Sequence, residues 1–129
     1  MPDTHHRRGE PSIPAEISKA IVGIVHDYTG RGPTMARTTI HDGLVTVLMG
    51  DSLIKAERRL VETGQADLVL RIRRTFQEAM SKDMTAAIGD LTGRRVTAFM
   101  SANHIDPDMG VEIFILAPEV PAPTGASPG

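Results

Sequence analysis

The segment from Arg94 to Leu116 restricts the fold of this chain more than any other part of the sequence. Two β-like apolar runs flank the polar stretch 103–108, which reads Asn-His-Ile-Asp-Pro-Asp. Asn103 and Asp106 favour Asx turns, Pro107 fixes φ, and strand-forming residues on both sides of such a stretch are typical of a β-hairpin. The segment therefore predicts two antiparallel strands joined by a structured turn.

A second hairpin is predicted earlier in the chain. Residues 35–40 and 44–49 are both β-like, and Asp42-Gly43 lies between them. An Asp-Gly pair between two such runs is a strong hairpin signal, because glycine supplies the positive φ that a tight turn needs. The sequence thus predicts four strands in two hairpins, all antiparallel.

Three helices are predicted around these hairpins. The first begins near Ser12 and stops at Gly30, the second covers 53–63, and the third covers 67–91. The third carries a continuous apolar stripe at three- and four-residue spacing, formed by Val69, Ile72, Phe76, Met80, Met84, Ala87, Ile88 and Leu91. The order α-β-β-α-α-β-β indicates a two-layer α+β fold with an antiparallel four-stranded sheet and three helices.

The chain has 129 residues, enough for one domain with its own core. We expect that domain at 12–117. Residues 1–11 are polar with two prolines, and four of the twelve residues at 118–129 are proline, so both ends are predicted to be disordered tails.

Composition excludes several functional classes. The absence of cysteine rules out disulfides and thiolate catalysis. A net charge of −2 and an aromatic content of 3% argue against nucleic-acid partners. No apolar run approaches the roughly 20 residues of a membrane span, and no signal peptide is evident. We therefore expect a soluble cytoplasmic protein that does not insert into the membrane.

The strands predict that both faces of the sheet are covered. On the last strand Val111, Ile113 and Ile115 point one way, and Phe114 and Leu116 point the other. A half-exposed antiparallel sheet alternates apolar and polar residues instead. Either three helices cover both faces, or they cover one while a partner subunit covers the other, and we favour a homodimer.

The polar turn offers one candidate site. His104, Asp106 and Asp108, with Glu112 nearby, are residue types that bind divalent metals or perform acid–base catalysis. The alternatives are recognition of a ligand or partner by this loop, with Asn103, and a purely structural turn. We favour the structural turn, and predict neither a metal nor a cofactor.

Arginines offer a second candidate. If Arg71, Arg74 and Arg95 converge, they form an anion-binding site, since guanidinium groups bind phosphate and carboxylate. The alternative is a solvated face paired with acidic residues. Glu112 alternates with apolar residues, so we expect it to be buried, either paired with Arg95 or Arg71 or as an acid of raised pKa.

Six segments carry a resemblance to a known family. The sequence resembles the MpsC-like proteins, named after a component of a Na+-translocating, membrane-potential-generating system, over roughly 14–118. The longest matching string runs from Leu91 to Met109. The matching segments are 30–33, 42–50, 57–60, 71–80, 91–96 and 103–114.

The resemblance implies a non-catalytic accessory or interaction protein with a membrane-system protein as partner. Two other functions stay open from the residues alone. One is a metal- or acid–base-assisted small-molecule hydrolase at His104, Asp106 and Asp108. The other is an anion-binding regulatory module built on the three arginines.

Overall fold

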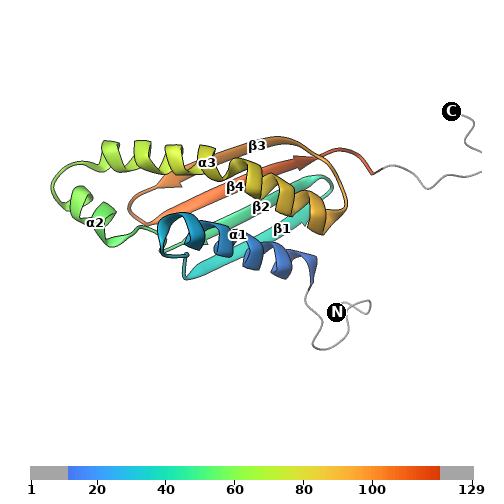
Figure 1. Cartoon of the computed structure of the whole chain (residues 1–129), viewed down its shortest axis with the longest axis horizontal. Coiled ribbons are helices and arrows are strands. Elements are labelled where there is room, and N and C mark those ends of the chain that lie inside the picture. Colours follow the sequence, from blue (N-terminus) through green and yellow to red (C-terminus); the bar gives the residue numbers. More distant parts are fainter. Residues whose placement is uncertain (1–11, 120–129) are drawn as a thin grey trace, which may run out of the picture.

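The computed structural model describes residues 12–119. Its order of elements confirms the predicted α+β fold (Figure 1). The predicted tails lie outside the described residues, apart from 118 and 119. The elements are α1 (Ile13–Thr29), β1 (Met35–His41), β2 (Leu44–Gly50), α2 (Lys55–Glu62), α3 (Ala66–Thr92), β3 (Val96–His104) and β4 (Met109–Leu116).

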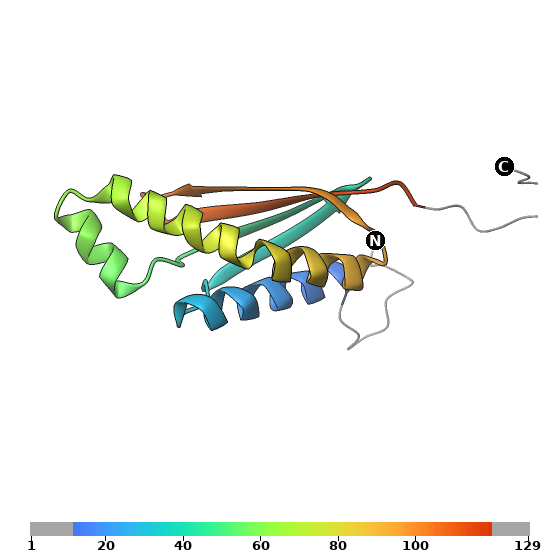
Figure 2. The same cartoon turned by 45° about the horizontal axis from the view of Figure 1, so that its top comes forward.

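The four strands form one antiparallel sheet in the order β1-β2-β4-β3. The two hairpins therefore join through β2 and β4, which become the central strands. Helices α1 and α3 lie side by side across one face of this sheet, and α2 sits beyond its end against the start of α3 (Figure 2). Within residues 12–119, no helix lies over the other face of the sheet.

Local chemistry explains where the helices begin and end. The Ser12 side chain accepts a hydrogen bond from the Ala15 N–H at 3.2 Å, which satisfies a free donor at the start of α1. Gly30 and Gly93 end α1 and α3 in the left-handed conformation, with φ of 80° and 68°. The boundaries differ from the predicted ones by one or two residues, most clearly at α2, which begins at Lys55 rather than Leu53.

The β1–β2 turn differs from expectation in one detail. Asp42, not Gly43, has the positive φ, at 50°. Aspartate tolerates this region because its short polar side chain can bond locally. Gly43 is needed for space instead: a Cβ there would lie 3.2 Å from the carbonyl oxygen of Leu116, whose N–H donates to the Gly43 carbonyl.

The core lies between the sheet and the two long helices. The inner face of the sheet contributes alternate residues of β2 and β4, and each helix contributes one stripe. The stripe of α3 differs from the predicted one, because Arg73 and Gln77 are buried where Ile72 and Phe76 were expected to be. The fully or nearly buried apolar residues that pack together are Ile17, Ile21, Val25, Val45, Val47, Met49, Met80, Met84, Ile88, Phe114 and Leu116.

Candidate functional site

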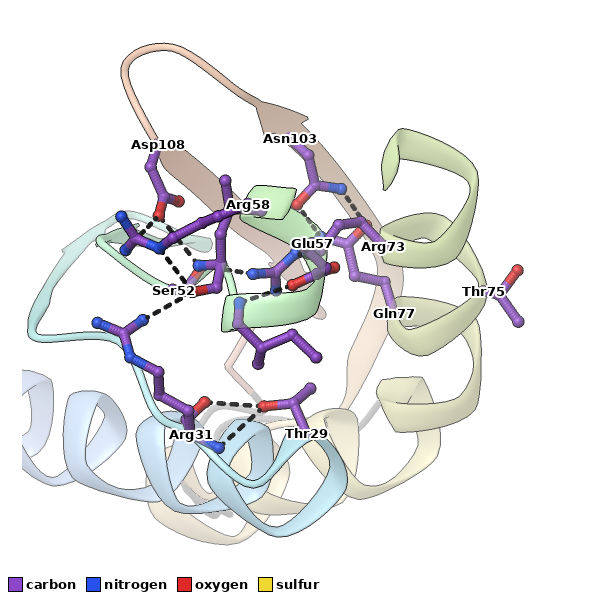
Figure 3. A network of polar contacts seen from close by, with 12 residues as sticks. Thr29, Arg31, Ser52, Glu57, Arg58, Arg73, Thr75, Gln77, Asn103 and Asp108 are labelled. Atoms are coloured by element: carbon purple, nitrogen blue, oxygen red, sulfur yellow. Dashed lines mark hydrogen bonds and ion pairs between the residues drawn. The ribbon is translucent and has the colours of Figure 1, made fainter. Parts of the chain in front are cut away.

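A chain of buried polar side chains occupies the end of the core where α2 and the first half of α3 meet the sheet (Figure 3). It replaces the apolar packing found at the other end. Because buried polar groups are costly unless they are paired, their partners decide what the cluster can do. We use the name buried polar network for the buried residues Ser52, Glu57, Arg73, Gln77 and Glu112 together with the half-buried Asn103.

An ion pair between α2 and α3 forms one half of this network. The Glu57 Oε2 atom lies 3.1 Å from Arg73 Nε, and the two side chains are only 4% and 8% exposed. The contact is an ion pair rather than a hydrogen bond. The other oxygen of Glu57 accepts from the Ile54 N–H at 2.9 Å, and Arg73 Nη2 donates to the Ser52 hydroxyl at 3.2 Å. The pair thereby fastens the start of α2 to α3.

Glu112 forms the other half, on β4. Its Oε2 atom accepts from Gln77 Nε2 at 3.1 Å, whereas its Oε1 atom is buried and has no hydrogen-bond partner among the residues that the structure describes. Gln77 also exchanges hydrogen bonds with the Asn103 amide, at 2.7 and 3.3 Å. Burial raises the pKa of Glu112 to about 7, although the Gln77 hydrogen bond and the charge of Arg73 oppose this rise. Glu112 therefore changes its protonation state near neutral pH.

Predicted burial of Glu112 is confirmed, because the residue is 1% exposed. The predicted arginine partner is wrong: neither Arg95 nor Arg71 reaches the carboxylate, and the contacting side chain is Gln77 on α3. Arg71 lies on the exposed side of that helix, while Arg73 is the arginine that turns inward. The apolar pattern pointed to the wrong arginine, because it placed Ile72 and Phe76 at the centre of the buried face of α3.

A second polar cluster joins the loops at the same end of the sheet. Asp51, which has a positive φ of 57°, accepts a hydrogen bond from the Thr34 hydroxyl at 2.8 Å. Arg31 Nη2 lies 3.0 Å from the same oxygen, Oδ2, and Arg58 of α2 donates to Oδ1. The Thr34 hydrogen bond, followed by those from the two arginines, lowers the pKa of Asp51. This cluster was missed, because its members lie far apart in sequence with no common motif.

Asp108 belongs to this second cluster and not to a site with His104. One carboxylate oxygen accepts from the Leu53 N–H at 3.0 Å and lies 3.7 Å from Arg58 Nη2. Its backbone carbonyl accepts from the Asp51 N–H at 3.1 Å. Asp108 therefore anchors the β3–β4 turn to the segment that leads into α2.

The other residues of the alternative metal or acid–base site, His104 and Asp106, do not join this second cluster. His104 is exposed, and its Nδ1 donates to the Pro107 carbonyl oxygen at 2.8 Å, within the turn itself. Asp106 is also exposed. Within residues 12–119, no three histidine or acidic side chains come close enough to hold a metal ion. The geometry thus gives the hydrolase alternative no assembled site.

The three arginines of the predicted anion site do not converge either. Arg71 and Arg74 lie in the first half of α3, whereas Arg95 follows its end. Thr92 lies eighteen positions after Arg74 along the helix, a distance of roughly 27 Å at 1.5 Å per residue. Arg74 instead lines a hollow of about 280 Å³ between α3 and β3, together with Asn103 and Gln77. One pair of predicted site residues, Arg74 and Asn103, is therefore brought together.

Comparison with known proteins gives one match. The family described as "Na+-translocating membrane potential-generating system (MpsC)" matches residues 10–118. No curated protein and no solved structure matches the chain. The family match covers the whole folded region described above, including both polar clusters.

Proposed function

This chain belongs to the MpsC family, and from that premise we propose that it is a non-catalytic interaction protein of a Na+-translocating, membrane-potential-generating system. Its part in that system is to bind another protein rather than to transform a small molecule. None of the helices within residues 12–119 has the length and hydropathy of a membrane span. A cytoplasmic location belongs to the same proposal.

The observation that supports this proposal most directly is that the side chains capable of catalysis make structural contacts. Asp108, Glu57 and Arg73 hold loops and helices together, and Glu112 is buried on the inner face of the sheet. An enzyme of the predicted kind requires His104 and Asp106 to face a shared hollow with Asp108. They lie on an exposed turn instead. Groups committed to structural contacts favour a scaffold over a catalyst.

The first half of α3 provides a docking surface for the partner. Helix α1 runs beside the second half of α3 only, so the first half is open on one side (Figure 1). There Leu68, Ile72 and Phe76, spaced four residues apart, line an apolar hollow of about 370 Å³ with Arg71 beside them. A partner segment with apolar and acidic side chains matches this surface, because such a segment buries the stripe and pairs with the guanidinium group.

Complementation of cells that lack the gene tests this function. Membrane potential is measured with a potential-sensitive dye at several external Na+ concentrations. We expect the wild type to restore a Na+-dependent potential, and the double variant His104→Ala/Asp106→Ala to restore it equally. Arg71→Glu should fail to restore it, whereas Lys82→Glu, a matched charge reversal on an exposed position of the same helix, should succeed.

The outcomes separate the alternatives. If the His104→Ala/Asp106→Ala protein is folded by circular dichroism but does not restore the potential, the turn takes part in the function, and the assignment of that function to the α3 surface alone is wrong. If even the wild type has no effect on the potential, the chain has no role in such a system. Cell fractionation of the tagged protein tests the cytoplasmic location.

A further inference from the structure

The outer face of the sheet is apolar and has no cover in the described part of the chain. Its central rows are formed by Leu44 opposite Ile115, Thr46 opposite Ile113, and Leu48 opposite Val111. Helices α1 and α3 lie on the opposite side of the sheet (Figure 2). The neighbouring strand β3 adds Met100 opposite Ile113, and its side chain is 51% exposed. Water-facing strands normally place polar residues at such positions.

Charge is confined to the margin of this face. Arg37 lies on the edge strand β1, and His41 and His104 lie at strand ends. The outward positions of β2 and β4, as far as the structure describes them, are apolar apart from Thr46 and Gly50. A partner for this face must therefore be apolar and uncharged at its centre, because an unpaired buried charge is costly.

The size of the face matches what a stable dimer needs. Four strands about 4.8 Å apart, with at least seven residues at about 3.4 Å each, span roughly 19 by 24 Å. Two such faces bury roughly 900 Å² in total as flat areas, and side-chain relief increases this toward the ~1,000 Å² of a specific interface. The apolar part of this face, over β2, β4 and β3, spans roughly 14 by 24 Å, or about 350 Å² on each copy. An exposed apolar patch of a few hundred Å² often marks an interaction surface.

The same face also carries a projection and a hollow that fit each other. The hollow, about 330 Å³, lies over Leu48, Ala102, Met109 and Val111. Met100 projects two residues away along β3. Consider a two-fold axis in the plane of the interface, perpendicular to the strands, between the row of Met100 and Ile113 and the row of Ala102 and Val111. Rotation about this axis places the Met100 side chain of each copy over the hollow of the other copy. Self-complementarity of this kind is the requirement for a symmetric dimer.

We propose that a second copy of this chain covers the outer sheet face, giving a two-fold symmetric sandwich of two four-stranded sheets with the helices outside. The two sheets then lie about 10 Å apart, as in other sandwiches. This leaves the apolar hollow of α3 free for a different partner. The dimer does not depend on the proposed function, since it rests on the sheet alone.

Light scattering during size-exclusion chromatography of the full chain tests the dimer. We expect the wild type at twice the 13.9 kDa chain mass, and Ile113→Glu at the single-chain mass with an unchanged far-ultraviolet spectrum. Ala86→Glu, the same kind of change at an exposed position of α3, should stay dimeric. A wild-type monomer refutes the proposal. So does a dimer that persists in Ile113→Glu, because a dimer paired through strand edges would survive that change.

Cross-linking keeps the test decisive if Ile113→Glu does not fold. The chain has no cysteine, so one introduced thiol is unique. Thr46→Cys lies on the central strand β2 and points outward, and a short bismaleimide should join two copies through it. Ala86→Cys should remain uncross-linked. Absence of a Thr46→Cys product, or equal yields from both variants, overturns the proposal.

Discussion

Glu112 makes the stability of this protein depend on pH in a direction opposite to that of an ordinary carboxylate. Its pKa rises from the usual 4.5 to about 7 in the folded protein, mainly through burial. Each pKa unit corresponds to about 1.4 kcal/mol, so keeping this group ionised in the folded state costs about 3 kcal/mol. This cost reflects a buried carboxylate, one oxygen of which has no hydrogen-bond partner among residues 12–119.

The sign follows from proton binding. Between pH 4.5 and 7 the folded state holds more protons on Glu112 than the unfolded state, so the free energy of unfolding falls as pH rises. The stabilising effect of proton binding by Glu112 is fully present below pH 4.5 and is lost above about pH 7. Glu112→Gln removes the charge but keeps the shape and the bond from Gln77. The free energy of unfolding of this variant should therefore exceed that of the wild type by about 3 kcal/mol at pH 8, and the two should be nearly equal at pH 5.

Urea unfolding at pH 5, 6, 7 and 8, followed by circular dichroism, measures this difference. Comparing variant with wild type at each pH cancels the titration of the histidines. Glu78→Gln, an exposed change on α3, serves as the control and should leave the pH profile unaltered. A difference between Glu112→Gln and wild type that is constant with pH, or a variant that is less stable at pH 8, refutes the reasoning.

Three further predictions concern single contacts. Glu57→Gln leaves the charge of Arg73 buried and uncompensated, so it should lower the free energy of unfolding, measured by urea titration, by about 3 kcal/mol or more. Replacing both residues by apolar ones (Glu57→Leu/Arg73→Met) should lower it by less. Ser12→Ala removes the cap of α1 and should cost about 1 kcal/mol, seen as a lower Tm. The Thr34 hydrogen bond and two guanidinium groups lower the pKa of Asp51, so its stabilising contribution is present above pH 3.8 and is lost as pH falls through that lowered pKa. Asp51→Asn should therefore flatten the acid limb of the stability profile, measured by unfolding below pH 4.

Local patterns predicted the elements well because they depend on neighbours in sequence. Ser12 begins α1 and Gly30 ends it, both as the sequence predicted, and Gly93 ends α3. The alternation along the last strand also predicted the burial of Glu112 and an apolar surface on the opposite side. The order of elements and the antiparallel sheet follow from these patterns, and the structure confirms them.

The candidate site was less predictable, because it depends on contacts between distant segments. A shift of the α3 interior from Ile72 to Arg73 changes which side chain reaches Glu57 and lies near Glu112. Asp108 is close in sequence to His104 but bonds to Leu53 across the sheet end. Proximity in sequence therefore suggested a site in the turn that does not form. It gave no sign of the second polar cluster around Asp51, whose members lie far apart in sequence.

Short segments of the sequence specify the helices, the hairpins and the apolar character of both sheet faces, since periodicity and caps are local properties. The packing of distant segments places α1 and α3 together on one face and α2 beyond the end of the sheet. It also decided which polar groups meet. The physical reason is range: hydrophobic periodicity shows that a face is to be buried but not what buries it, and a hydrogen bond or ion pair requires atoms within about 4 Å. That precision arises only when strand register and helix rotation are set by packing.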